Sequence, residues 1–121
     1  MTTMRSAARA LTTAAVLCAA SVVCADIRIG IHVPSSGRSA ADGHSALEGA
    51  KLAVAQANAR GGVSGQRVEL IAYDDQASFQ GAVNAAARFI DKDRVVGVVT
   101  GSYSAPTGAV ASAMQHAGLP Y

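Results

Sequence analysis

The pattern of apolar and polar residues along the chain predicts strands and helices in alternation. Short runs rich in Val and Ile predict strands, and a stretch with helical spacing of its apolar residues follows each run. The predicted strands are residues 26–33, 67–73 and 94–100. The predicted helices are residues 43–60, 79–91 and 105–117. The order is βαβαβα, and Tyr121 is expected to begin a fourth strand.

Each predicted helix carries a stripe of apolar residues that is expected to face the core. The stripes are Leu47, Ala50, Val54 and Ala57 in the first helix, Phe79, Val83, Ala86 and Ile90 in the second, and Val110, Ala113, Met114 and Ala117 in the third. The third strand run, "RVVGVVT", is nearly all apolar, which predicts a strand covered on both faces. Gly61-Gly62 and Gly118 are expected to end the first and third helices.

This alternation is typical of an α/β fold with a parallel sheet and right-handed crossover connections. Ligands of such sheets bind beyond the carboxyl ends of the strands. Three loops are expected there, at residues 34–42, 74–78 and 101–106. We therefore look for function in these loops.

The first 25 residues are expected to be a secretory signal rather than part of the fold. Arg5 and Arg9 precede an apolar stretch of small residues, and Val23-Cys24-Ala25 fits a signal-peptidase site, with cleavage after Ala25. The alternative is a membrane anchor, but the apolar run is shorter than the ~20 residues that a spanning helix needs.

Without this segment, the remaining residues differ from the whole chain in net charge and cysteine content. Residues 26–121 hold eight basic and eight acidic side chains, so their formal charge is zero and nothing indicates nucleic-acid binding. Both cysteines, Cys18 and Cys24, lie in the signal, so the remainder offers neither a disulfide nor a thiolate metal site.

The loop after the third strand is rich in hydroxyl groups. Ser104 stands where a helix N-cap is expected, and Pro106 falls in the first helical turn. One interpretation is that Ser104 only caps its helix. The other is that the helix N-terminus and the serines together bind an anion. The loop does not carry a dinucleotide-binding glycine pattern, a P-loop or a nucleophile elbow.

Other polar residues give weaker signals. Asp74 and Asp75 could bind a metal or share a proton, or they could cap the next helix and bond to the turn. The three histidines, His32, His44 and His116, lack a common ligand spacing, so we predict neither a metal nor a cofactor. They also do not complete a recognisable Ser-His-Asp set.

An ordered series of short motifs resembles the leucine/isoleucine/valine-binding protein family, the extracytoplasmic solute receptors of ABC importers with the type I periplasmic-binding fold. The motifs are Gly49-Ala50-x-x-Ala53-Val54, Asn58-x-x-Gly61-Gly62, Gly65-x-x-Val68, Tyr73-Asp74-Asp75 and "GSYSAPTGAVASAMQHAGLPY". The resemblance covers residues 26–121. It implies part of the first lobe of a two-lobed protein, with the second lobe absent, and so a truncated product or fragment.

The resemblance also implies a ligand site. It suggests that Ser104, Ser102, Tyr103 and the amide of Ala105 hold the carboxylate of a small ligand. The loop with Ser36, Gly37 and Asp42 would contact the ligand's side chain. Members of the family often carry an aromatic residue where this chain has Asp42, and Arg38 lies in the same loop, so a ligand more polar than an aliphatic amino acid is possible.

The sequence and the resemblance leave three functions open. The first is a non-enzymatic, periplasmic solute-binding component of an ABC importer for branched-chain or other amino acids or related small carboxylates. It would be a monomer that works with a permease in the inner membrane. The second is a ligand-sensing domain of a receptor or regulator with the same fold. The third, more remote, is a small serine hydrolase that uses Ser104.

Overall fold

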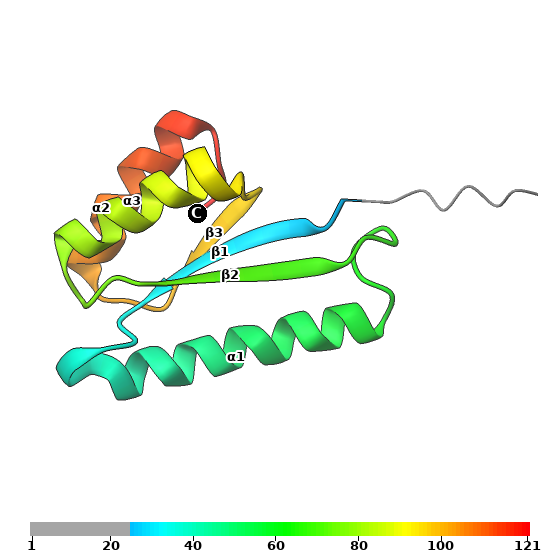
Figure 1. The fold of residues 1–121 in the computed structure, drawn as a ribbon, viewed down its shortest axis with the longest axis horizontal. Helices are drawn as coiled ribbons and strands as arrows, with labels where there is room; N and C mark the ends of the chain where they lie inside the picture. Colours follow the sequence, from blue (N-terminus) through cyan, green and yellow to red (C-terminus); the bar gives the residue numbers. More distant parts are fainter. Residues whose placement is uncertain (1–24) are drawn as a thin grey trace, which may run out of the picture.

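The chain folds as a three-stranded parallel sheet with helices on both faces (Figure 1). The computed structural model describes residues 25–121, so the expected signal lies outside the described residues except for Ala25. The elements in chain order are β1 (Ile27–Val33), the 3₁₀ helix η1 (Gly37–Ser39), α1 (Ala40–Ala59), β2 (Val68–Asp74), α2 (Phe79–Ala87), the π-helical turn η2 (Arg88–Asp93), β3 (Gly97–Thr100) and α3 (Ser104–Ala117). The predicted α/β class and parallel sheet are confirmed.

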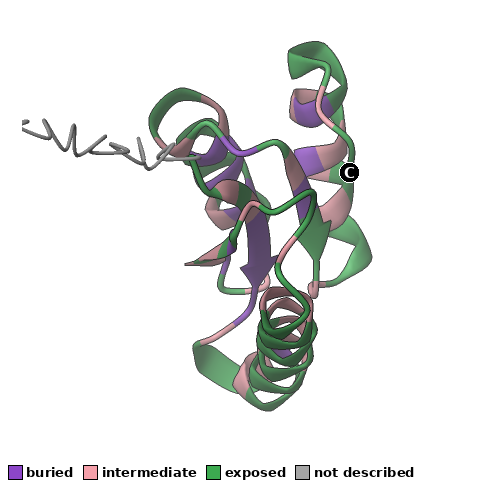
Figure 2. Cartoon of the chain, turned by 90° about the vertical axis from the view of Figure 1, so that its right-hand side faces the viewer, coloured by how far each residue is buried: buried purple, intermediate pink, exposed green. Residues whose placement is uncertain are grey.

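The strands lie in the order β2-β1-β3, so β1 is central and its two neighbours are edges. Helix α1 lies along one face, over β1 and β2, while α2 and α3 pack together on the other (Figure 1). Figure 2 shows how exposed α1 is: most of its surface faces solvent, and the buried residues gather between the sheet and the other two helices.

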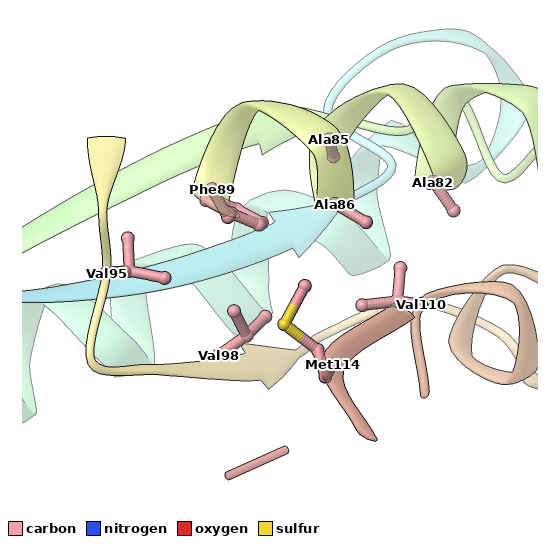
Figure 3. Close-up of a cluster of buried hydrophobic side chains, with 8 residues drawn as sticks. All are labelled: Ala82, Ala85, Ala86, Phe89, Val95, Val98, Val110 and Met114. Carbon is pink, nitrogen blue, oxygen red and sulfur yellow. The ribbon is translucent and has the colours of Figure 1, made fainter. Parts of the chain in front are cut away.

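The main core lies between the sheet, α2 and α3 (Figure 3). Its buried members are Ala82, Ala85, Ala86, Phe89, Val95, Val98, Val110 and Met114. Phe89 is fully buried and packs directly over β1, where a Cβ on Gly30 would lie only 2.7 Å from its ring. The strand therefore needs glycine at this position to make room for the aromatic ring.

The predicted helix faces are only partly right. All four stripe residues of α1 are half-buried, as expected, but in α2 Phe79 and Val83 are 64% and 37% exposed. The predicted Ala86 is buried and Ile90 is half-buried, but the other buried residues of α2 are Ala82 and Ala85. Small side chains let two helices and a sheet approach closely, which a face led by phenylalanine would not allow. In α3 the predicted Val110 and Met114 are buried and Ala113 is half-buried, but Ala117 is exposed.

The prediction that the third strand is covered on both faces is wrong. Val98 is 6% exposed, whereas Val99, which points to the opposite face, is 49% exposed. The reason is that β3 is an edge strand, and α1 covers β1 and β2 rather than β3. On the free edge of β3, the amide of Val98 donates to the carbonyl of Pro120 at 3.0 Å, but Tyr121 does not form part of a strand.

Two helices begin at other residues than predicted. Helix α1 starts at Ala40 directly after η1, so Asp42 lies in its first turn and not in a loop. The N-cap of α3 is Tyr103, whose backbone is extended, and Ser104 is the first helical residue, so the prediction of Ser104 as N-cap is wrong. Gly118 ends α3 in the left-handed conformation, as expected.

Candidate functional site

The three predicted loops meet at the carboxyl ends of the parallel strands. After β3 the chain turns sharply at Gly101, whose amide donates to the carbonyl of His32 at 3.0 Å. A Cβ on Gly101 would lie 2.6 Å from Ala46 in α1 and 2.8 Å from Val33 in β1. The turn that leads into α3 therefore packs closely against the end of β1 and the first half of α1.

The N-terminus of α3 is open to a ligand. Its N-cap, Tyr103, makes no side-chain hydrogen bond to the helix, and Ser104 and Ala105 are exposed. The first amides of a helix have no intrahelical acceptor, and the helix dipole gives this end a partial positive charge. An anion placed here would accept hydrogen bonds from these amides and from the Ser104 hydroxyl.

Ser102 lies in the same turn and is unusual among the described residues. Its hydroxyl oxygen is buried but has no hydrogen-bond partner. Its amide is held by the Thr100 hydroxyl at 3.2 Å, and that hydroxyl also contacts Thr107 at 3.1 Å. A buried hydroxyl without a protein partner costs about 1–3 kcal/mol, so Ser102 is a candidate to bond a polar group of a ligand.

Asp42 and Tyr103 come together across 61 residues of sequence. The Tyr103 hydroxyl donates to the Asp42 carboxylate at 2.6 Å, which ties the first turn of α1 to the start of α3. The carboxylate thus stands about one tyrosine side chain away from the α3 N-terminus. Two of the residues predicted from different loops are therefore neighbours.

The loop after β1 is joined to the turn after β2 instead. Asp74 accepts hydrogen bonds from the amides of Ser35 and Gln76, both at 2.9 Å. Burial acts to raise the pKa of Asp74, but the hydrogen bonds from the Ser36 side chain and the neighbouring amides outweigh it, so the pKa lies below its ordinary value. Ser36 and Gly37 are exposed, and Gly37 has a φ of +74°. No hydrogen bond joins these two residues to the turn at 101–104 in the part of the chain that the structure describes.

A buried polar cluster lies beneath this site, and the sequence analysis did not find it. His32 and Asp75 are both fully buried, and their Nδ1 and Oδ2 atoms are 2.7 Å apart. The other ring nitrogen, Nε2, lies 2.9 Å from the Tyr121 hydroxyl, which donates to the carbonyl of Thr107 at 3.0 Å. Burial is the main cause that raises the pKa of Tyr121 above its ordinary value.

This cluster bears on two of the earlier interpretations. Asp75 also accepts from the amide of Ala77 at 2.8 Å, so it bonds to the turn, which was one alternative for the paired aspartates. For the hydrolase alternative, the Nε2 atom of His32 lies against the Tyr121 hydroxyl, and no hydrogen bond joins His32 to Ser104 among the described residues. The only sequence signal was the position of His32 and Asp75 near the carboxyl ends of neighbouring strands.

Three further findings concern metal binding, membrane spans and surface hollows in the described residues. No group of three or more His, Cys, Asp or Glu could hold a metal ion within residues 25–121. No helix in that range is long and apolar enough to cross a membrane. Hollows of about 190 and 410 Å³ lie against β2, one beside α2 and the other beside α1. Asp74 lines the first, and none of the residues predicted to hold the ligand lines either.

Comparison with known proteins gives a clear family match. Residues 26–121 match the family model described as periplasmic binding protein. Leu/Ile/Val-binding protein homolog 7 from Brucella melitensis is 38% identical over 113 residues, covering 93% of this chain and 28% of the relative. An amino acid binding protein from Pseudomonas aeruginosa is 33% identical over 95 residues, covering 78% of this chain and 25% of the relative.

Solved structures agree with this match. The branched-chain amino acid transporter substrate binding protein LivJ from Streptococcus pneumoniae, in complex with isoleucine, superposes with a TM-score of 0.76 at 31% identity, over 79% of this chain and 28% of that one. The leucine binding protein LivK from Thermotoga maritima gives a TM-score of 0.70 at 31% identity, over 78% of this chain and 26% of that one. The chain thus spans little more than a quarter of the length of these relatives.

Proposed function

The chain belongs to the periplasmic binding protein family, and on that basis we propose that it forms part of the solute-binding component of an ABC importer. The relatives are named as binding proteins for branched-chain or other amino acids, and the neighbouring structures include substrate-binding proteins of transporters. The proposed role is binding without chemistry, outside the cytoplasm, with delivery of the ligand to a membrane permease.

The observation that carries the proposal is the construction of the turn before α3. It combines an uncapped helix N-terminus, an exposed Ser104 and the buried, unpartnered hydroxyl of Ser102. These are donors, and they converge where the dipole favours negative charge. The proposed ligand is therefore an amino acid or a related small carboxylate whose carboxylate group binds at this turn.

The Asp42–Tyr103 contact suggests what else the ligand carries. A carboxylate group seated at the α3 N-terminus would have the Asp42 side chain within the length of a tyrosine. Charge complementarity then favours a ligand with a hydrogen-bond donor or a cationic group at its other end over one with an aliphatic side chain. Arg38, in the 3₁₀ helix η1 just before α1, is a second charged residue of the same segment.

Isothermal titration with the twenty amino acids and a set of small carboxylates tests the proposal. We expect Ser104→Ala to weaken binding of the best ligand by about 1.5–3 kcal/mol, the range for a hydrogen bond to a charged group, with little change in Tm. Ser112→Ala, an exposed serine further along α3, is the matched control and should change neither quantity. Equal affinity in wild type and Ser104→Ala would mean that the Ser104 side chain does not bind the ligand.

A further inference from the structure

Thr100, the last residue of β3, has a hydroxyl group that contacts both sides of the turn before α3. The hydroxyl oxygen accepts from the amide of Ser102, two residues further along, at 3.2 Å. It also lies 3.1 Å from the hydroxyl of Thr107, which belongs to the start of α3. A hydroxyl oxygen has two acceptor lone pairs, so the contact with Thr107 leaves one for the Ser102 amide whichever threonine donates. One side chain thus joins the strand, the turn and the helix.

The turn needs such restraints because it holds the Ser102 hydroxyl buried and without a protein partner. An unfavourable arrangement of this kind persists only where the surroundings determine it. Two of the restraints are bonds between backbone groups at 3.0 Å, from the amide of Gly101 to the carbonyl of His32 and from the amide of Thr107 to the carbonyl of Tyr103. The restraint on Ser102 itself comes from the Thr100 side chain.

We propose that Thr100 is a positioning residue of the candidate site. Its hydroxyl fixes the backbone of Ser102 and so holds the Ser102 hydroxyl where a ligand carboxylate can accept from it. Strand formation alone does not require this hydroxyl, since the two preceding residues of β3, Val98 and Val99, are β-branched without one. The consequence for a ligand rests on the proposed function, whereas the hold on the Ser102 backbone does not.

Tyr121 offers another explanation for the two threonines. Its hydroxyl donates to the carbonyl of Thr107 at 3.0 Å and has the Thr100 and Thr107 hydroxyls as further partners. If Thr100 served only the contact with Tyr121, changes at Thr100 and at Tyr121 would affect the Ser102 amide alike. The positioning role predicts instead that this amide depends on Thr100 and not on Tyr121.

Hydrogen exchange of the backbone amides, followed by NMR in the whole chain without a ligand, tests the hold on Ser102. We expect Thr100→Val to speed exchange of the Ser102 amide about 2- to 12-fold, the range for one net hydrogen bond. Tyr121→Phe should leave it unchanged. The matched control is Val99→Thr, the reverse exchange at a neighbouring position that is 49% exposed, and it should also have no effect. An unchanged Ser102 amide in Thr100→Val, or an equal effect in Tyr121→Phe, would overturn the proposal.

Isothermal titration with the best ligand of the amino-acid panel tests the consequence for binding. We expect Thr100→Val to weaken binding about 2- to 12-fold, and Thr100→Ser, which keeps the hydroxyl, to bind like wild type. The preference of strands for valine over serine should order the Tm values of the two variants the other way. Affinities that follow Tm would mean that Thr100 acts only through the stability of the fold, and would refute the positioning role.

The two measurements separate failure of this inference from failure of the proposed function. Wild-type binding that stays equally tight in Thr100→Val would overturn the positioning role and leave the proposed function intact. A wild-type chain that binds no compound of the panel would contradict the proposed function, and with it the consequence of Thr100 for a ligand. Exchange of the Ser102 amide decides in either case whether Thr100 holds the turn.

Discussion

Replacing Ser102 by alanine should change stability and binding in opposite directions. The buried hydroxyl has no partner, so in the free protein its desolvation is not offset, at a cost of about 1–3 kcal/mol. Alanine removes this cost and leaves only the space of one oxygen atom. We therefore expect Ser102→Ala to raise the free energy of unfolding by up to about 1 kcal/mol, a shift in Tm of about 4–8 °C for a domain of this size.

Binding should respond in the other direction. If the hydroxyl donates to a ligand carboxylate, its loss removes a charge-assisted hydrogen bond of about 1.5–3 kcal/mol, or about 10- to 150-fold in affinity. Urea denaturation gives the first quantity and isothermal titration with the best ligand of the amino-acid panel gives the second. Ser112→Ala on the exposed side of α3 serves as control, with both quantities unchanged.

The opposite pattern would refute the reasoning. A Ser102→Ala protein that is less stable by 1 kcal/mol or more, yet binds as well as wild type, would mean that the hydroxyl serves the fold and not a ligand. A variant that is more stable but binds less well, by contrast, is the result expected when a buried polar group serves the ligand at the expense of stability.

Three further predictions concern the fold that holds the site. Phe89→Ala should lower the free energy of unfolding by about 3–5 kcal/mol because the ring is fully buried, whereas Phe79→Ala, 64% exposed, should change it by less than about 0.5 kcal/mol; urea denaturation compares them, and equal losses would contradict the core described here. Gly101→Ala should cost about 1–3 kcal/mol because the new Cβ meets side chains of α1 and β1 at 2.6 and 2.8 Å, while Gly108→Ala, with open space around it in a helix, should stabilise by about 0.5–1 kcal/mol. Asp74 has a lowered pKa in the folded state, so it adds stability above the ordinary carboxyl pKa of about 4 that is lost as the pH falls through the folded value; acid titration of Asp74→Asn should show a shallower fall than wild type, and an identical fall would remove Asp74 as a cause.

The order of elements could be predicted from the sequence because the local patterns are strong. β1 is rich in Ile and Val, β2 combines Val68, Ile71 and Tyr73 with other apolar residues, and Gly118 ends α3 by its left-handed conformation. The buried side of α2 could not be predicted, because two apolar stripes compete in it. Only the close packing of Ala82, Ala85 and Ala86 against α3 and the sheet decides between them.

The candidate site, too, could be predicted from the sequence only in part. The sequence indicates the hydroxyl-rich turn and places it at the end of a strand. It does not indicate that Tyr103 is the N-cap, nor that its hydroxyl bonds to Asp42, 61 residues away. The His32–Asp75 pair depends on the register of β1 against β2, which places Val33 opposite Asp74 and brings the next carboxylate to the histidine.

The most direct test of the central claim is an amide NMR titration of the chain with the best amino acid of the panel and with its carboxamide analogue. NMR suits this test because it reports binding residue by residue and also detects weak binding. We predict that the amino acid shifts the amides of residues 102–105 and that the carboxamide, which lacks the charge, does not. Equal shifts with both compounds, or shifts only outside this turn, would contradict the claim that the start of α3 is a carboxylate site.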